Sequence, residues 1–135
     1  MQALLLPVGE DLYAVPVNDV QEVLVAPVFT PLPTAPAHSR SLINVRGEVV
    51  PLLDTATLLG LGTLENVPYA VLVDSGRGIA AFAVSGVPTF VTLTKPSGVS
   101  ELPGTRGQYQ AGGQVVVLLD PEELMHGTWE APDAR

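Results

Sequence analysis

Residue types that can carry chemistry are scarce in this chain. It has no cysteine and only two histidines, His38 and His126, which lie far apart in the sequence. Without cysteine there is no thiolate nucleophile, disulfide or thiolate-bound metal, and two distant histidines lack the local spacing of a zinc site. No serine lies in a Gly-x-Ser-x-Gly turn, and no Gly-Lys-Ser/Thr sequence marks a phosphate loop. We therefore expect neither a bound metal nor a cofactor.

Aspartates that follow apolar runs are the remaining catalytic candidates. Asp54 lies in the sequence Leu-Leu-Asp-Thr-Ala, which resembles the active-site strand end of retroviral-type aspartic peptidases, although Ala56 stands where that family has glycine. In such enzymes two copies of a short chain each contribute one carboxylate to a shared proton. Asp74 is a weaker match. The alternatives are a homodimeric peptidase that uses Asp54, or a structural role in which Asp54 caps a helix and Asp74 belongs to a turn.

Composition narrows the possible partners. The 135 residues carry a formal net charge of −8, and 47% of them are hydrophobic. An acidic chain lacks the basic footprint that nucleic acid requires, so we expect no nucleic-acid partner. No apolar run approaches the ~20 residues that span a bilayer, and the start of the chain has no basic segment typical of a signal peptide. These features predict a cytoplasmic protein that does not insert into a membrane.

Short runs rich in Val, Leu and Thr, separated by turn residues, predict a mainly β fold. The expected strands are residues 2–6, 12–17, 20–25, 48–53, 69–74, 79–84, 89–93 and 114–119. Hairpin turns are expected at residues 9–10, 75–78 and 112–113, where glycine supplies positive φ. Prolines are concentrated between residues 27 and 36, which predicts an extended surface connection that pairs with no strand.

Two short helices are expected, each after a similar strand. Asp120 is a typical cap for the second helix and Asp54 for the first, and Gly127 should end the second helix. Residues 47–54 align without gaps with residues 113–120, at an offset of 120 − 54 = 66 residues. We interpret this repeat as two related lobes, each a small β-barrel with few exposed strand edges.

Surface recognition is the functional class that remains. Arg46 beside Gly47 should project outward where a buried strand begins, and its guanidinium offers a planar set of donors. The alternative is an ordinary surface ion pair with Glu22 or Glu48, which would contribute little stability.

Several segments together resemble the CheW-like domain family. Residues 20–24, 30–36 and 43–54 follow the order and spacing of that domain, and the run from Asn44 to Asp54 has its pattern Asn-x-Arg-Gly-x-x-x-Pro-x-x-Asp. Residues 58–61 and 117–124 also fit, so the resemblance covers nearly the whole chain.

The resemblance implies a single domain over residues 1–135, built from two small, intertwined, SH3-like five-stranded β-barrel lobes with short helices, followed by a flexible tail over residues 128–135. It implies a non-catalytic adaptor with two partners, the regulatory domain of a CheA-type histidine kinase and the cytoplasmic tip of a methyl-accepting chemoreceptor. The implied partner-binding residues are Val17, Val20, Glu22, Val23, Asn44, Arg46 and Gly47.

Two local features depart from the family pattern. Ser85 stands where the family has an acidic residue, and residues 94–110 form a short segment rich in Pro and Gly. The latter feature predicts a trimmed second barrel.

Overall fold

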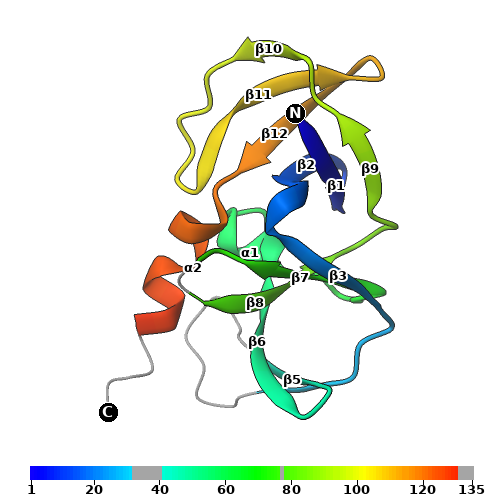
Figure 1. Cartoon of the computed structure of the whole chain (residues 1–135), viewed down its shortest axis with the longest axis vertical. Helices are drawn as coiled ribbons and strands as arrows, with labels where there is room; N and C mark the ends of the chain where they lie inside the picture. Colours follow the sequence, from blue (N-terminus) through cyan, green and yellow to red (C-terminus); the bar gives the residue numbers. More distant parts are fainter. Residues whose placement is uncertain (32–40, 77, 131–135) are drawn as a thin grey trace.

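Two six-stranded β-sheets pack against each other in a computed structural model that describes residues 1–31, 41–76 and 78–130 (Figure 1). The sheet of the upper lobe contains, in spatial order, β10 (Lys95–Gly98), β11 (Thr105–Ala111), β12 (Gln114–Leu119), β2 (Asp11–Pro16), β1 (Gln2–Val8) and β9 (Thr89–Thr92). The sheet of the lower lobe contains β4 (Phe29–Pro31), β5 (Ser41–Val45), β6 (Glu48–Asp54), β8 (Ile79–Val84), β7 (Tyr69–Asp74) and β3 (Val20–Val25). The helical elements are η1 (Val17–Asp19), α1 (Thr55–Leu58) and α2 (Pro121–Glu130).

Both sheets have the same pattern of parallel and antiparallel strand pairing when read in the orders given above. Neighbouring strands are antiparallel except for one parallel pair in each sheet, β12 with β2 and β6 with β8. β6 leads into α1, and β12 leads into α2. The lower lobe is one continuous stretch of chain, whereas the upper lobe combines the first two strands with the last four. The sequence repeat therefore corresponds to a structural repeat, and the two lobes are intertwined through the chain.

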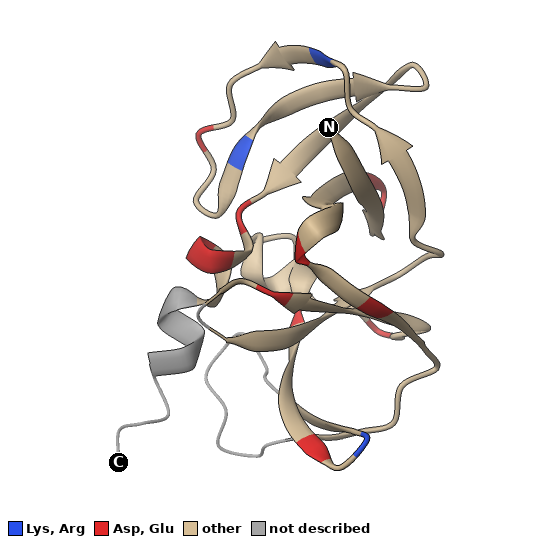
Figure 2. Cartoon of the chain, in the orientation of Figure 1, with Lys and Arg blue, Asp and Glu red and all other residues tan. Residues whose placement is uncertain are grey.

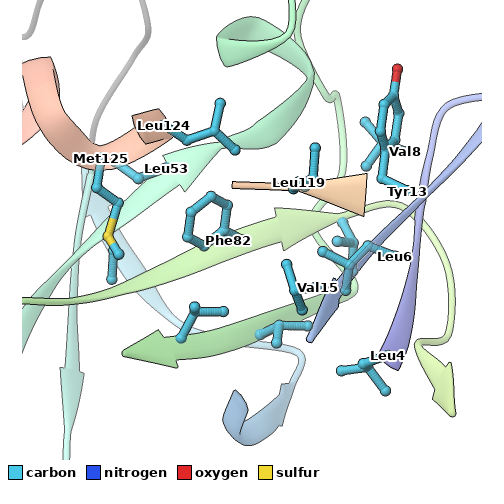
Figure 3. Close-up of a cluster of buried hydrophobic side chains, with 14 of the residues drawn as sticks. Leu4, Leu6, Val8, Tyr13, Val15, Leu53, Phe82, Leu119, Leu124 and Met125 are labelled. Carbon is cyan, nitrogen blue, oxygen red and sulfur yellow. The ribbon is translucent and has the colours of Figure 1, made fainter. Parts of the chain in front are cut away.

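A shared hydrophobic core joins the lobes (Figure 3). Successive residues of a strand point to opposite faces of its sheet, so each sheet has one face for the shared core and one for its own lobe. Leu4 and Leu6 of β1 lie in the shared core with Phe82 of β8, while Ala3 lies in the core of the upper lobe. The lower lobe has a separate core around Ile43. Burial of these apolar side chains is the main favourable term in folding.

All eight expected strands are present, and those over residues 20–25, 69–74, 79–84 and 114–119 have the expected bounds. β4, β5, β10 and β11 were not expected. The prediction that the proline-rich stretch pairs with no strand was wrong at its start, because β4 pairs with β5. Proline is tolerated there since β4 is an edge strand. Residues 32–40, including His38, lie outside the described residues.

The upper lobe is not trimmed, which corrects the expectation drawn from residues 94–110. That segment contributes β10 and β11, and β11 pairs with β12 along most of its length. With β4 and β10 at their edges, the sheets have six strands instead of the expected five.

The second helix is longer than expected. α2 continues through Gly127 to Glu130, so Gly127 does not end it and His126 lies within the helix rather than at its end. A glycine inside a helix costs roughly 1 kcal/mol relative to alanine, a penalty that tertiary packing can offset. Leu124 and Met125 of α2 are buried in the shared core, and this packing explains why the helix persists. Of the expected tail, residues 128–130 belong to α2, and residues 131–135 lie outside the described residues.

Candidate functional site

The turn between β5 and β6 presents Arg46 at one end of the lower lobe. Arg46 and Gly47 both have positive φ, 53° and 88°, as a two-residue hairpin turn requires. The side-chain oxygen of Asn44 accepts a hydrogen bond from the backbone N–H of Gly47 at 2.9 Å. Positive φ is unfavourable for arginine. The Asn44 bond and the pairing of Val45 with Glu48 hold the turn in this conformation.

Arg46 forms an ion pair with Glu22 of β3. Its Nη2 atom donates to Oε1 of Glu22 at 2.5 Å, and the two side chains are 72% and 30% exposed. Arg46 lies in the turn between β5 and β6, and Figure 2 shows basic colour at that end of the lower lobe. The other described Lys and Arg residues, Lys95 and Arg106, lie in β10 and β11 of the upper lobe. An exposed pair of this kind contributes about 0–1 kcal/mol to stability. The ion pair therefore adds little to the stability of the fold.

A groove of about 380 Å³ lies beside this ion pair. Its wall on one side is β3 and the chain that follows it, and its wall on the other side is β5 and the β5–β6 turn. The lining residues are Glu22, Leu24, Val25, Ala26, Pro27, Val28, Ile43, Asn44, Val45 and Arg46. We call this feature the edge groove. It combines apolar walls with one charged end, which suits an apolar ligand that also carries charge.

The structure brings together only some of the residues that the resemblance implies. Glu22, Asn44 and Arg46 line the charged end of the edge groove, and Gly47 is bonded to Asn44 in the adjoining turn. The other three residues lie elsewhere. Val20 packs partly buried against the shared core. Val17 is half-buried in η1, and Val23 is 37% exposed on β3 but alternates away from Glu22 and Leu24.

The aspartates singled out in the sequence make bonds to the backbone. Asp54 is the N-cap of α1, and its two oxygens accept the N–H groups of Thr57 and Leu64, each at 3.1 Å. Asp120 accepts the N–H of Glu123 at 3.3 Å. Asp74 accepts the N–H of Gly76 at 2.8 Å within a turn. The structure therefore gives no support to a peptidase that uses Asp54, because its carboxylate is engaged in holding α1 and the chain after it.

A second and larger groove, of about 520 Å³, borders the shared core between the lobes. β2 and β12 of the upper lobe form its floor, and Leu61, just after α1 of the lower lobe, lies at its rim. The lining residues are Glu10, Asp11, Leu12, Tyr13, Leu61, Leu102, Gln114, Val115 and Val117. Burial, with a smaller effect from the charge of Asp11, raises the pKa of the Tyr13 hydroxyl, which therefore stays neutral. We call this feature the inter-lobe groove.

Sequence reasoning missed most of the edge groove. Val25 and Val28 are 71% and 87% exposed, and they lie where β3 runs into the Pro27 region. The available signal was an apolar run that continues past the end of the strand into a proline, where neither a strand nor a core explains it. Apolar residues outside regular elements are candidates for a binding surface.

Neither groove offers a metal site in the part of the chain that the structure describes, since no three His, Cys, Asp or Glu side chains converge there. In the same residues, no helix has the length and apolar character needed to cross a membrane.

Comparisons with known proteins agree with this fold. Residues 2–128 match the CheW-like domain. The chemotaxis protein CheW of Thermotoga maritima is 22% identical over 131 residues, which cover 92% of this chain and 87% of that protein. The chemotaxis protein CheW of Rhizobium meliloti is 32% identical over 87 residues, which cover 61% of this chain and 56% of that protein.

The crystal structure of the scaffolding protein TtCheW from Thermoanaerobacter tengcongensis has the same fold. It superposes with a TM-score of 0.75 at 20% sequence identity, covering 87% of this chain and 82% of that one. The match over residues 2–128 includes both lobes and the edge groove. This chain therefore belongs to the CheW-like domain family.

Proposed function

We propose that this chain is a non-catalytic, cytoplasmic adaptor that couples chemoreceptors to a CheA-type histidine kinase, in chemotaxis or a related motility pathway. The observation that carries the proposal is the match to the CheW-like domain over residues 2–128. Three relatives named as chemotaxis proteins and one named as a scaffolding protein support it. The proposed activity is binding, and it includes no chemical step.

The two grooves suit two different partners. The inter-lobe groove has exposed apolar residues at its rim, with Leu61 46%, Leu102 54% and Val115 51% exposed. A helical receptor tip would place an apolar stripe on these residues, as amphipathic helices do in hydrophobic grooves. The Glu22–Arg46 end of the edge groove would contact the regulatory domain of the kinase through charge-assisted hydrogen bonds. Coupling then arises because the adaptor binds the receptor's signalling states with different free energies.

Binding assays with the two partners test this proposal. We expect a receptor cytoplasmic fragment and a kinase regulatory domain each to bind the purified chain. Val115→Glu should weaken receptor binding roughly tenfold, about 1.4 kcal/mol, and leave kinase binding unchanged. Arg46→Ala should weaken kinase binding. Val99→Glu is the matched control, because Val99 is 79% exposed and lies outside both grooves. If neither partner binds the folded chain, the proposed function is wrong.

A further inference from the structure

The edge groove lies where the lower sheet is incomplete. β4 pairs with β5 only from Ser41 to Ile43, so Asn44 and Val45 extend beyond the end of β4. On the opposite side of the groove, β3 is the other edge strand of the same sheet. Leu24 of β3 and Val45 of β5 contribute to the core of this lobe and also line the groove. The groove is therefore an opening between two strand edges that leads onto the core of the lower lobe.

The corresponding place in the upper lobe is filled. The N–H of Leu93 donates to the carbonyl of Met1, just as the N–H of Ala26 donates to the carbonyl of Pro68, so Leu93 is the counterpart of Ala26. Leu93 is 2% exposed and lies in the core of its lobe, whereas Ala26 is exposed. In the upper lobe a leucine side chain fills this place, whereas the lower lobe has an opening beside an alanine. We infer that the lower lobe leaves room for an external side chain.

The strand pairing differs in the same way between the lobes. Asn44 pairs with Val49, and its counterpart Gln110 pairs with Val115 in the aligned strand of the upper lobe. Gln110 also pairs with Lys95 of β10, but β4 does not reach Asn44. One more residue pair is therefore available on this side of β5. An extended peptide can add to a free strand edge through backbone hydrogen bonds, with its side chains entering adjacent pockets.

The edge groove is also distinguished by its backbone conformation and its charge. Within the described chain, Ala26 and Arg46 are the two non-glycine residues with positive φ, at 49° and 53°, and both line the edge groove. Such conformations are unfavourable and concentrate at functional sites. Arg46 bonds Glu22 through Nη2 and remains 72% exposed. Its planar guanidinium has further N–H donors, which can donate hydrogen bonds to a carboxylate of a ligand.

We propose that the edge groove binds an extended segment of a partner protein, with apolar side chains and a carboxylate, by strand addition to β5. The backbone of the segment pairs beside Asn44, an apolar side chain enters the opening next to Ala26, and the carboxylate bonds Arg46 in competition with Glu22. This inference rests on the proposed function, and it specifies the chemistry of the segment that meets Arg46.

Titration of the full chain with a synthetic peptide tests the proposal. The probe is acetyl-Thr-Val-Asp-Val-Thr-amide, followed by backbone amide NMR. We expect saturable shifts at Asn44, Val45 and Arg46, with binding weakened at least tenfold when lysine replaces the aspartate of the peptide. N-methylation of the peptide amides that pair should abolish binding. Shifts centred on Val115 and Leu61, or no saturable shifts, would overturn the proposal.

Two variants of the chain give opposite expected effects. Glu22→Gln removes the competing carboxylate and should strengthen peptide binding about threefold, while Arg46→Gln should weaken it about tenfold. Folding of both variants is checked by their amide spectra. If the ion pair only kept the groove in shape, both substitutions would break it and both would weaken peptide binding. That result would count against the proposal.

Two further measurements separate the possible failures. Because the peptide assay needs no kinase or receptor, normal peptide binding with no partner binding would reject the proposed function and leave the groove chemistry standing. Sedimentation at several protein concentrations tests a second copy as the occupant. A dimer that the peptide dissociates would assign the edge groove to self-association and overturn the proposal of a different partner.

Discussion

Thr55, the first residue of α1, has a fully buried hydroxyl with no hydrogen-bond partner among the described residues. An unpaired buried hydroxyl costs about 1–3 kcal/mol. Thr55→Val keeps the shape of the side chain and removes the polar atom. We expect the free energy of unfolding to increase by about 1 kcal/mol, measured by urea denaturation.

Thr57 provides the matched control within the same helix. Its hydroxyl donates to the carbonyl of Gly62 at 2.9 Å, so Thr57→Val removes a bond that exists. This control should lose about 0.5–1.5 kcal/mol. If Thr55→Val were destabilised as much as Thr57→Val, the hydroxyl of Thr55 would have a partner in solution.

Asp19 in η1 makes stability depend on pH. Burial raises the pKa of its carboxyl, the negative charges of Asp74 and Asp120 raise it further, and Arg106 opposes them. A carboxyl with a raised pKa in the folded state contributes stability at pH below its unfolded pKa and loses that contribution as pH rises through its folded pKa. Asp19→Asn should therefore raise the melting temperature at pH 7 relative to the parent chain.

The comparison should be repeated at acid pH. Below pH 3 the carboxyl of Asp19 is protonated in both states, so the advantage of Asp19→Asn should shrink. Glu101→Gln, at an exposed position, controls for the change in net charge alone. An advantage that stays constant from pH 3 to pH 7 would show that the carboxyl does not act through its ionisation.

The charged end of the edge groove could be predicted from the sequence, whereas its apolar part could not. Arg46 follows an asparagine and precedes a glycine, which is the pattern of an exposed turn, and Glu22 was one of two possible acidic partners. In the structure Arg46 pairs with Glu22. The opening beside Ala26 depends on where β4 stops and on which residue faces the core of each lobe. Both are set by contacts between strands that are distant in sequence.

Among the elements, α2 depends on a close approach by the chain before β11. Gly104 has φ of 83°, its carbonyl accepts the N–H of Asp120 at 2.8 Å, and a Cβ there would lie 2.3 Å from the side chain of Leu124. Gly104→Ala should reduce the free energy of unfolding by about 2–4 kcal/mol, combining the cost of positive φ with overpacking. Thermal and urea denaturation measure the loss.

Two comparisons isolate the contact with α2. Gly60 also has a positive φ, 75°, but no atom lies within 4 Å of the position of a new Cβ. Gly60→Ala should therefore show the backbone cost alone. In a double-mutant cycle, Leu124→Ala should relieve part of the cost of Gly104→Ala, because neighbouring changes are not additive. Equal losses for Gly104→Ala and Gly60→Ala would indicate that α2 shifts freely.

Strands rich in Val and Leu were predictable because their burial decides their structure. β7, β8 and β12 are central strands with long apolar runs, and the sequence predicts their bounds. β10 and β11 contain few apolar residues, so pairing with β12 and with each other decides their conformation. β4 was missed for a related reason, since its proline is compatible only with an edge position that sequence alone does not reveal.

For the whole molecule, the chain path links the lobes as firmly as the shared core does. The upper lobe needs β1 and β2 from the start of the chain, and these reach the lower lobe through η1. The chain returns to the upper lobe after β8, where Ser85 bonds to the turn between β1 and β2 and to the end of β1. The Ser85 hydroxyl accepts the N–H of Gly9 at 2.9 Å and donates to the carbonyl of Pro7 at 3.2 Å. Neither lobe can separate without exposing apolar surface, so the two should unfold together.

Native-state hydrogen exchange tests this cooperativity. Phe82 is fully buried in the shared core, and Phe82→Ala should cost about 3–5 kcal/mol. If the lobes form one unit, the slowest amides of β1 and β7 should lose protection by the same free energy. Leu118→Ala, in the core of the upper lobe, should also lower protection in both strands, while Val49→Ala at a 58% exposed site should change neither. A loss confined to β1 in Leu118→Ala would mean that the lobes unfold separately, and that the shared core does not transmit stability between them.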